Sequence, residues 1–434
     1  MITGQKLWRR AKQIIPGGNM LLSKRPEMFI PNHWPTYFSK AKGCEVWDLD
    51  DNKYIDASLM GVGTNILGYG HPEVDEAVTR AINKGNMATL NCPDEVHLAE
   101  KLINLHPWAD MVKFARTGGE ANTISVRIAR AASSKENIAF CGYHGWHDWY
   151  LSANLGKNKE LDNHLLPGIN TNGVPSKLNK TVFPFKYNDI NALKNIISNN
   201  NIGIIKMEVE RSEKPKDDFL IKVRKLATRN NIVLIFDECT SGFRETYGGL
   251  HLKYNVNPDI AIFGKALGNG YPITAVIGRE EIMEAAQSTF ISSTFWSDRI
   301  GPAAANKTLE VMNEMKSWSY ITKLGKEIKK NWEKISNSYN IDLCISGIDA
   351  LATLKFKSNS SQKYKTLLTN EFLKCDILAT NSIYTSTAHS KKMMQKYYSV
   401  LDNIFSILFK CENGYDIKNF YNGPLSHAKF KRLN

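Results

Sequence analysis

Hydrophobic and polar positions alternate through the middle of the chain in a way that separates strands from helices. Short apolar runs, which are typical of buried strands, lie at residues 137–143, 202–209, 232–237, 260–263 and 273–277. Apolar residues recur at helical spacing in residues 94–105, 122–133 and 217–231. This alternation predicts an α/β fold, with a mostly parallel sheet and helices on both faces. In such a sheet, ligands bind beyond the carboxyl ends of the strands.

The two ends of the chain follow other patterns. Residues 45–57 alternate between apolar and polar positions around the turn sequence Asp-Asp-Asn-Lys, which predicts a β-hairpin. From about residue 301 onward, long amphipathic segments rich in lysine predict helices. We therefore expect a large domain at residues 58–305. A smaller α+β domain would combine residues 306–434 with the N-terminal segment 1–57.

Length, composition and cysteine content narrow the class of protein. A chain of 434 residues with 42% hydrophobic residues is long enough for more than one hydrophobic core. No apolar stretch reaches the roughly 18 residues of a membrane span, and the first residues lack the apolar region of a secretory signal. The seven cysteines are scattered, as is usual for free thiols in a reducing compartment. We expect a cytoplasmic protein with no membrane partner.

The chain is basic, with a formal net charge of +13 from 56 Lys and Arg residues against 43 Asp and Glu residues. The excess is dispersed along the sequence, and no motif of a nucleic-acid-binding domain accompanies it. We therefore expect no nucleic-acid partner. A positive field would still help to attract an anionic substrate.

One lysine stands where a charge is unusual. Lys265 follows the apolar run 260–263, and Gly268, Gly270 and Pro272 turn the chain before the next run begins. Lysine is rarely fully buried, so a lysine at the mouth of two buried strands calls for a chemical reason. A desolvated amine has a lowered pKa and is a better nucleophile toward an aldehyde.

Two further features lie at the same expected edge of the sheet. Asp237 ends a strand-like run, where a carboxylate either faces a ligand or caps a loop. Gly118 and Gly119 precede the helix expected at residues 122–133. Backbone N–H groups at the start of a helix suit a phosphate, although an ordinary turn before a helix has the same sequence pattern.

The segment 141–150 reads Cys-Gly-Tyr-His-Gly-Trp-His-Asp-Trp-Tyr. Its possible metal ligands match no zinc spacing, so we expect no metal; they are Cys141, His144, His147 and Asp148. Its aromatic residues would either belong to the core or stack on a flat ring. An amine, a strand-end acid, a phosphate site and an aromatic loop together suit pyridoxal 5'-phosphate (PLP), which needs an amine for its Schiff base and an acid for its pyridine nitrogen.

The sequence from the end of this strand to the lysine loop resembles the cofactor-lysine signature of class III aminotransferases. The matching positions are Asp237, Glu238, Gly242, Phe243, Arg244, Pro258, Asp259, Lys265, Gly270 and Pro272. The resemblance covers most of the chain up to about His389, and is greatest to glutamate-1-semialdehyde 2,1-aminomutase and to surface-sugar aminotransferases. It implies a fold-type-I PLP enzyme that works as a homodimer, with active sites shared between the subunits.

The resemblance also implies roles for individual residues. Lys265 would form the Schiff base with the cofactor and then transfer protons as acid and base. Asp237 would hold the proton on the pyridine nitrogen. Tyr143 would stack on one face of the ring, and Cys239 would take the place of the family's usual Val on the other.

Other family positions imply the rest of the cofactor site. Gly118 and Gly119 would bind the phosphate through their N–H groups, and Thr294 would reach it from the neighbouring subunit. Glu208 ends its strand as the family's Glu does. Gly119 stands where the family usually has Thr, which removes one hydroxyl from the phosphate site. Glu213 stands where the aminomutase has Asn. Together with the other departures from the aminomutase, this favours a plain transaminase.

Several cationic residues are candidates for binding an anionic group of the substrate. They are His144, Arg211, Arg244, Lys24 and Arg25. Each of them could instead be an ordinary surface charge. Arg244 has a second structural alternative, which is an ion pair with Glu238 or Glu208.

Four functional hypotheses follow. The first is a transaminase that moves an amino group from an amino acid to the carbonyl of a sugar-like or small hydroxylated acceptor, for cell-surface glycan biosynthesis. The second is a glutamate-1-semialdehyde 2,1-aminomutase. The third is another PLP reaction, such as decarboxylation or epimerisation. The fourth, a non-catalytic or metal-binding protein, is disfavoured by the presence of both Lys265 and Asp237.

Overall fold

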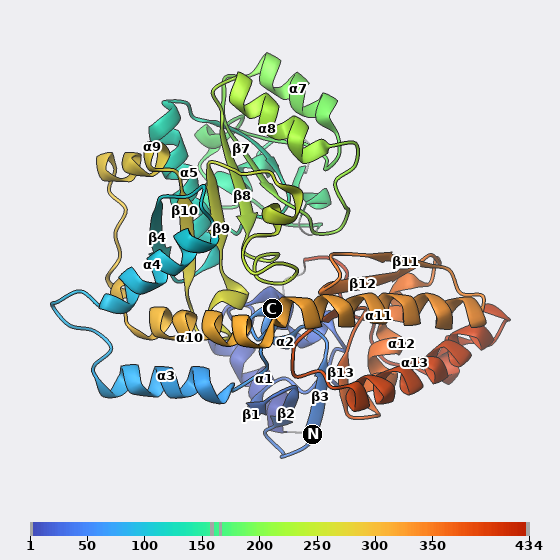
Figure 1. Ribbon diagram of the computed structural model, residues 1–434. Helices are drawn as coiled ribbons and strands as arrows, with labels where there is room; N and C mark the ends of the chain where they lie inside the picture. Colours follow the sequence, from blue (N-terminus) through green and yellow to red (C-terminus); the bar gives the residue numbers. More distant parts are fainter. Residues whose placement is uncertain (1–2, 157–159, 165–166, 431–434) are drawn as a thin grey trace. The chain divides into compact units, whose positions relative to one another are not determined.

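The computed structural model describes residues 3–156, 160–164 and 167–430, which form two compact units (Figure 1). One unit is Pro72–Ser319. The other combines the residues up to His71 with those from Tyr320 onward. The unit boundaries therefore follow residues 71 and 319, whereas the sequence places them after residues 57 and 305.

Local packing explains both differences. The segment before His71 belongs with the N-terminal strands, because Tyr69 pairs with Gly43 in a β-bridge and its hydroxyl lies 2.6 Å from Asp56 Oδ2. Helix α10 (Ile300–Met315) belongs with the large unit, since it packs against α3 (Pro72–Asn83) and α4 (Pro93–Leu105).

Within the described residues, the large unit has a seven-stranded sheet in the order β4-β10-β9-β8-β7-β5-β6. Its strands are β4 (Met111–Ala115), β5 (Asn137–Cys141), β6 (Val182–Pro184), β7 (Ile202–Glu208), β8 (Val233–Glu238), β9 (Ile260–Phe263) and β10 (Thr274–Gly278). The five predicted strands are confirmed as β5, β7, β8, β9 and β10. Strand β10 runs antiparallel to both of its neighbours, β4 and β9, and the other strand pairs of this sheet are parallel. The short loop from β9 to β10 holds no crossover helix, so it can only join antiparallel strands.

Helices cover the two faces of this sheet. Helix α5 (Gly118–Ser133) contacts β4 and β7 to β10, together with α9 (Glu280–Met283), and its apolar side packs into one buried cluster with residues of these strands. Helices α7 (Ile190–Asn199) and α8 (Phe219–Arg229) pack against each other and against β5 and β8 (Figure 1). The predicted α/β fold is confirmed, and the helices expected at 94–105, 122–133 and 217–231 are α4, α5 and α8.

The second unit is an α+β arrangement. One sheet has the order β1-β2-β3-β13 and the other the order β11-β12-β14, among the residues described. The strands are β1 (Phe38–Lys42), β2 (Glu45–Asp48), β3 (Lys53–Ala57), β11 (Leu343–Ser346), β12 (Leu351–Phe356), β13 (Ile377–Ala379) and β14 (Ser382–Tyr384). The predicted hairpin is the antiparallel pair β2–β3, whose turn is held by Asp48 Oδ1 accepting from Asp50 N and Asn52 N.

Helices supply most of the core of the second unit. They include α1 (Thr3–Ile14), α2 (Met60–Gly63), α11 (Ser317–Ser338), α12 (Ser361–Leu373) and α13 (Lys391–Glu412). The buried cluster contains Trp332 of α11, Phe372 of α12, and Tyr397 and Phe405 of α13. The Lys-rich amphipathic segments predicted after residue 301 are therefore helices that place one face in a core.

Candidate active site

Lys265 leaves the end of β9 in a strained conformation. All four residues of β9 are buried, and this packing holds in place the backbone from which the Lys265 loop begins. Its backbone φ is +41°, a left-handed value that is uncommon for a residue with a side chain. Such strain persists only where the surroundings enforce it, and it is concentrated at functional sites.

The Lys265 amine is held and partly deprotonated. Its Nζ donates a hydrogen bond of 2.8 Å to Thr240 Oγ1, in the loop after β8. Burial, assisted by the positive charge of Arg211, lowers the pKa of Lys265 to about 8. A usable fraction of the amine is therefore neutral near physiological pH, as attack on an aldehyde requires.

Asp237 and His144 form a buried pair at the end of β8. His144 Nδ1 lies 2.9 Å from Asp237 Oδ2, and its Nε2 lies 3.1 Å from the carbonyl oxygen of Cys141. Both ring nitrogens thus face acceptor oxygens, an arrangement that a ring with a proton on each nitrogen satisfies. The other carboxylate oxygen of Asp237 accepts from the N–H of Cys239 at 3.1 Å.

This environment keeps Asp237 ionised. Burial acts to raise its pKa, but the hydrogen bond and charge of His144 outweigh it, with help from the charge of Lys206 and the N–H of Cys239. The net result is a pKa well below the ordinary range of Asp. A carboxylate that stays negative is what a protonated pyridine nitrogen needs opposite it.

The predicted phosphate site, Gly118 and Gly119, lies at the N-terminus of α5. Thr117 caps the helix, because its side chain accepts from the Glu120 N–H while the Glu120 carboxylate accepts from the Thr117 N–H. The helix therefore begins at Gly118, four residues earlier than the sequence predicts, and places Gly118 and Gly119 in its first turn. The first N–H groups of a helix have no partner inside it and are available to an anion.

Gly119 fits its position for a steric reason. A Cβ atom at Gly119 would lie 2.9 Å from the His147 ring and 3.2 Å from the Trp146 indole nitrogen. The aromatic loop thus occupies the space into which the side chain of the family's Thr would project. Gly118 has more room, because its Cβ would meet only Cys239 Sγ, at 3.5 Å.

Tyr143 and Cys239 follow the ends of β5 and β8. The Tyr143 N–H donates to Glu208 Oε2 at 3.1 Å, and the Arg211 guanidinium lies 6.0 Å from the centre of its ring. Burial, together with the charge of Asp237, raises the pKa of the Cys239 thiol well above its ordinary value. Cys239 is therefore a neutral group suited to packing rather than a nucleophile.

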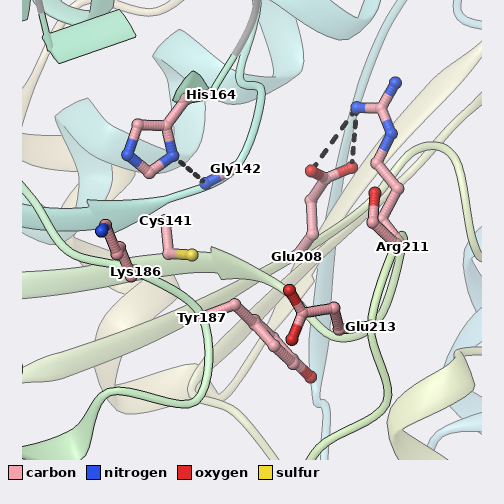
Figure 2. A pocket seen from close by; sticks show the side chains of 9 residues that line it. Cys141, Gly142, His164, Lys186, Tyr187, Glu208, Arg211 and Glu213 are labelled. Atoms are coloured by element: carbon pink, nitrogen blue, oxygen red, sulfur yellow. Dashed lines mark hydrogen bonds and ion pairs between the residues drawn. The ribbon is translucent and has the colours of Figure 1, made fainter. Parts of the chain in front are cut away.

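A cavity of about 560 Å³ opens beside Glu208 (Figure 2). It is lined by Cys141, Gly142, His164, Lys186, Tyr187, Glu208, Arg211, Ser212 and Glu213. Arg211 Nη1 lies 3.2 Å from Glu208 Oε1, so these two side chains form an ion pair in its wall. Glu208 is paired in register with Asp237 of β8, which joins the cavity to the cofactor residues.

The predicted substrate residues have different outcomes. His144 is fully buried and both of its ring nitrogens are engaged, so it does not fit a substrate-binding role and instead orients Asp237. Arg244 is also buried, and its Nε donates to the Thr240 carbonyl at 2.6 Å, which supports the loop that carries Thr240. Arg211 lines the cavity.

Three other predicted residues belong to other segments of the chain. Lys24 and Arg25 belong to the other unit, at the end of the turn η1 (Leu22–Lys24) and directly after it. Thr294 is exposed at the start of the turn η9 (Thr294–Ser297). The roles suggested for these residues stay predictions.

Sequence reasoning missed three participants. Thr240 is part of the signature segment but was not singled out as the partner of Lys265. His144 was assigned to the substrate rather than to Asp237. Lys206 lies inside the apolar run 202–209, where a single lysine was the available signal.

The site and the fold together define a PLP-dependent aminotransferase. A buried amine of lowered pKa, an ionised strand-end aspartate and the start of a long helix correspond to the aldehyde, pyridine nitrogen and phosphate of PLP. Within the ranges described, no group of three or more His, Cys, Asp or Glu side chains could hold a metal ion. Residues 30–396 match the model of the family described as aminotransferase class-III, so the chain belongs to the class-III aminotransferase family, whose cofactor is PLP.

Named relatives and solved structures agree with this family. The 3-aminobutyryl-CoA aminotransferase of Cloacimonas acidaminovorans (strain Evry) is 35% identical over 376 residues, covering 84% of this chain and 86% of that relative. The glutamate-1-semialdehyde 2,1-aminomutase of Methanobrevibacter smithii is 34% identical over 349 residues, covering 77% and 79%. FumI of Sphingopyxis sp. MTA144 shares the fold with a TM-score of 0.85 at 23% identity, over 95% of this chain and 98% of that one.

Over the part of the chain that the structure describes, none of the helices combines the length and the apolar character needed to cross a bilayer.

Proposed function

We propose that this class-III transaminase transfers an amino group from an amino acid to the carbonyl carbon of a sugar-like or small hydroxylated acceptor. The product would be an aminated building block for cell-surface glycans. The observation that carries the proposal is the polar cavity beside Glu208. Arg211 lines this cavity and its charge also acts on the pKa of Lys265, which ties the cavity to the reacting amine.

The lining of the cavity favours a hydroxylated acceptor over a long apolar one. Its wall holds cationic and anionic side chains together with the hydroxyl group of Ser212. These groups can donate and accept hydrogen bonds to several hydroxyls of one substrate. Lys186, which is exposed, adds a positive charge that suits a phosphate or carboxylate on the acceptor.

Different residues of the chain have different roles in the reaction. Bound PLP supplies an electron sink that makes the hydrogen next to the amino group acidic. Lys265 takes up and returns that proton at Nζ, and Thr240 Oγ1 accepts a hydrogen bond from the same nitrogen. Asp237 stays negative opposite the pyridine nitrogen, while Gly118 and Gly119 bind the phosphate through their N–H groups. The Glu208–Arg211 pair borders the space for the substrate.

The enzyme would act as a homodimer. Three exposed aromatic side chains gather on sequence segments around the phosphate helix and Thr294: Trp146 (68% exposed), Phe290 (83%) and Phe295 (68%). A second copy of the chain would cover them and bring its own Thr294 to the phosphate. Sedimentation equilibrium would give the mass of a dimer, whereas a monomeric holoenzyme with full activity would contradict this part of the proposal.

The test is a panel of half-reactions. The holoenzyme is first converted to its aminated form with an amino acid, and then mixed with keto sugars, dihydroxyacetone phosphate and simple keto acids. We expect the hydroxylated acceptors to give the highest kcat/KM, measured by mass spectrometry of the amino product. Glu213→Gln and Lys186→Ala should raise KM for the acceptor, whereas Lys222→Ala, an exposed lysine on α8, should not. The 3-keto counterpart of 3-aminobutyryl-CoA is added to the same panel. Fastest reaction with that compound or with unsubstituted keto acids would contradict the proposal.

A second candidate is glutamate-1-semialdehyde 2,1-aminomutase, because a relative with that name is 34% identical to this chain. The aminomutase reaction keeps its amino group and needs no external keto acid. Incubating the holoenzyme with the semialdehyde alone separates the two candidates: rapid formation of aminolevulinate would support the aminomutase. Release of carbon dioxide or racemised product from amino acids would instead indicate another PLP reaction.

A further inference from the structure

A lysine lies fully buried in the centre of the sheet. Lys206 is in β7, where every residue is buried, and its own exposure is 0%. Its Nζ lies 3.2 Å from Ser125 Oγ of α5. Ile204 and Ile235, its neighbours on this face of the sheet, belong to the apolar cluster under α5. Burying an ammonium group among apolar side chains is costly, and an apolar residue would serve packing better.

The strand register places this lysine on the same face of the sheet as Asp237, two residues closer to the start of the strands. Lys206 is paired with Ile235, and Glu208 is paired with Asp237, in the parallel ladder between β7 and β8. Side chains at alternate positions share a face, so Lys206, Glu208 and Asp237 lie on the α5 side of the sheet. The spacing of strands puts the Cα atoms of Lys206 and Asp237 about 8 Å apart.

The charges of the two residues influence each other. Burial lowers the pKa of Lys206 to about 8, while the negative charge of Asp237 opposes that decrease. In return, the charge of Lys206 helps to lower the pKa of Asp237. Lys206 therefore carries a positive charge below about pH 8, although it makes no ion pair as close as that of His144.

Other titratable groups surround this position. Cys239 follows β8 and interacts electrostatically with Lys206, but its thiol is neutral. Glu208, next on the same face of β7, is paired with Arg211. His144, from the loop after β5, is bound to Asp237. From α5, the group that faces Lys206 is the Ser125 hydroxyl, which does not titrate in this range.

We propose that Lys206 is a positioning residue that sets the proton affinity of the cofactor site from behind Asp237. Its ammonium group, held by Ser125, adds a positive charge on the protein side of the pyridine nitrogen. A nearby positive charge favours loss of protons from neighbouring groups. Lys206 thereby keeps Asp237 ionised and lowers the pH at which the nitrogen joining Lys265 to PLP gives up its proton.

The test removes the charge of Lys206 and keeps the approximate size and shape of its side chain. Lys206→Met removes the ammonium group from a side chain of similar length, and apolar neighbours surround it. The visible absorbance of bound PLP is titrated with pH in the native enzyme and in the variant. We expect the midpoint to rise by about one pH unit, which is the effect of losing one charge roughly 12 Å away in a medium of effective dielectric constant about 20. The alkaline shift should also appear in the pH profile of the half-reaction.

Two further variants complete the experiment. Lys365→Met removes another lysine of low accessibility, on α12 of the other unit, and should leave the midpoint unchanged. Ser125→Ala removes the hydroxyl that stabilises the ammonium group, so it should raise the midpoint by a smaller amount even if the methionine variant fails to fold. A midpoint in Ser125→Ala equal to that of the native enzyme, or in a folded Lys206→Met variant that binds PLP, would overturn the proposal and leave Lys206 with a packing role.

Discussion

His144 Nδ1 lies 2.9 Å from Asp237 Oδ2, in a pair whose side chains are 0% and 4% exposed. The sequence had suggested that His144 binds substrate. The structure shows instead that it pairs with Asp237 and helps to lower the pKa of that carboxyl group. The pair follows from topology, because the loop after β5 and the end of β8 lie at the same edge of the parallel part of the sheet.

The first prediction concerns this pair. His144→Gln removes the charged partner and leaves the Asp237 carboxylate buried without it. We expect the free energy of unfolding to fall by about 3 kcal/mol, the usual cost of breaking a buried ion pair from one side. Urea denaturation measures the change, with His33→Gln as a control because His33 is exposed. A variant as stable as the native enzyme would show that the pair contributes little.

The second prediction concerns the acid dependence of stability. The pKa of Asp237 is lower in the folded protein than in the unfolded chain, so Asp237 stabilises the fold above its unfolded pKa of about 3.9. This stabilisation is lost as the pH falls through the lower, folded value. Asp237→Asn should therefore flatten the loss of stability below about pH 4, measured by urea denaturation at a series of pH values. Glu281→Gln, an exposed acid-to-amide change, should leave that slope as it is.

The third prediction uses the pKa of Lys265. Only the neutral amine attacks an aldehyde, so the rate at which the apoenzyme binds PLP covalently should rise with pH and level off above about pH 8. Stopped-flow absorbance measures this rate. After borohydride reduction, mass spectrometry should find the cofactor on Lys265, and Lys265→Ala should lose both the label and turnover. Labelling of Lys206 instead would contradict the assignment.

The fourth prediction concerns the hydroxyl that holds this amine. Thr240→Val keeps the shape of the side chain but removes the acceptor for Lys265 Nζ. We expect kcat to fall about tenfold, equivalent to one hydrogen bond of about 1.4 kcal/mol, with little change in stability. Thr240→Ser should restore most of the activity, because it returns the hydroxyl. If both variants are equally impaired, the methyl group rather than the hydroxyl is important.

The fifth prediction concerns the start of α5. Gly119→Ala places a Cβ within about 3.0 Å of His147, where the loop has to move. We expect weaker PLP binding, measured by titration of the apoenzyme, because the displaced loop borders the phosphate site. Gly156→Ala is the matched control, since a Cβ there would meet nothing within 4 Å. Unchanged PLP affinity in Gly119→Ala would show that the loop can move without weakening PLP binding.

Patterns local in the sequence predicted the sheet strands and the main cofactor residues. Apolar runs predicted β7, β8 and β9, because a short apolar run is buried whatever the arrangement of the rest of the chain. The spacing from Asp237 to Lys265 was recognisable because both lie in continuous segments at the ends of these strands. The domain boundaries were harder to predict from the sequence. The unit to which residues near 60–71 belong depends on contacts with residues far along the chain. One such contact is the hydrogen bond that the Ser386 hydroxyl donates to the Ile66 carbonyl.

The sequence by itself determined the α/β class and the cofactor, and it indicated Lys265 as the reacting lysine, because each depends on short segments with characteristic chemistry. The tertiary structure decided that His144 pairs with Asp237, that Thr240 accepts a hydrogen bond from Lys265, and that Lys206 lies beside Ser125 on the same face of the sheet as Asp237. These are contacts between residues 25 to 93 positions apart. Such contacts depend on the order and register of the strands, and no local pattern of apolar and polar residues specifies them.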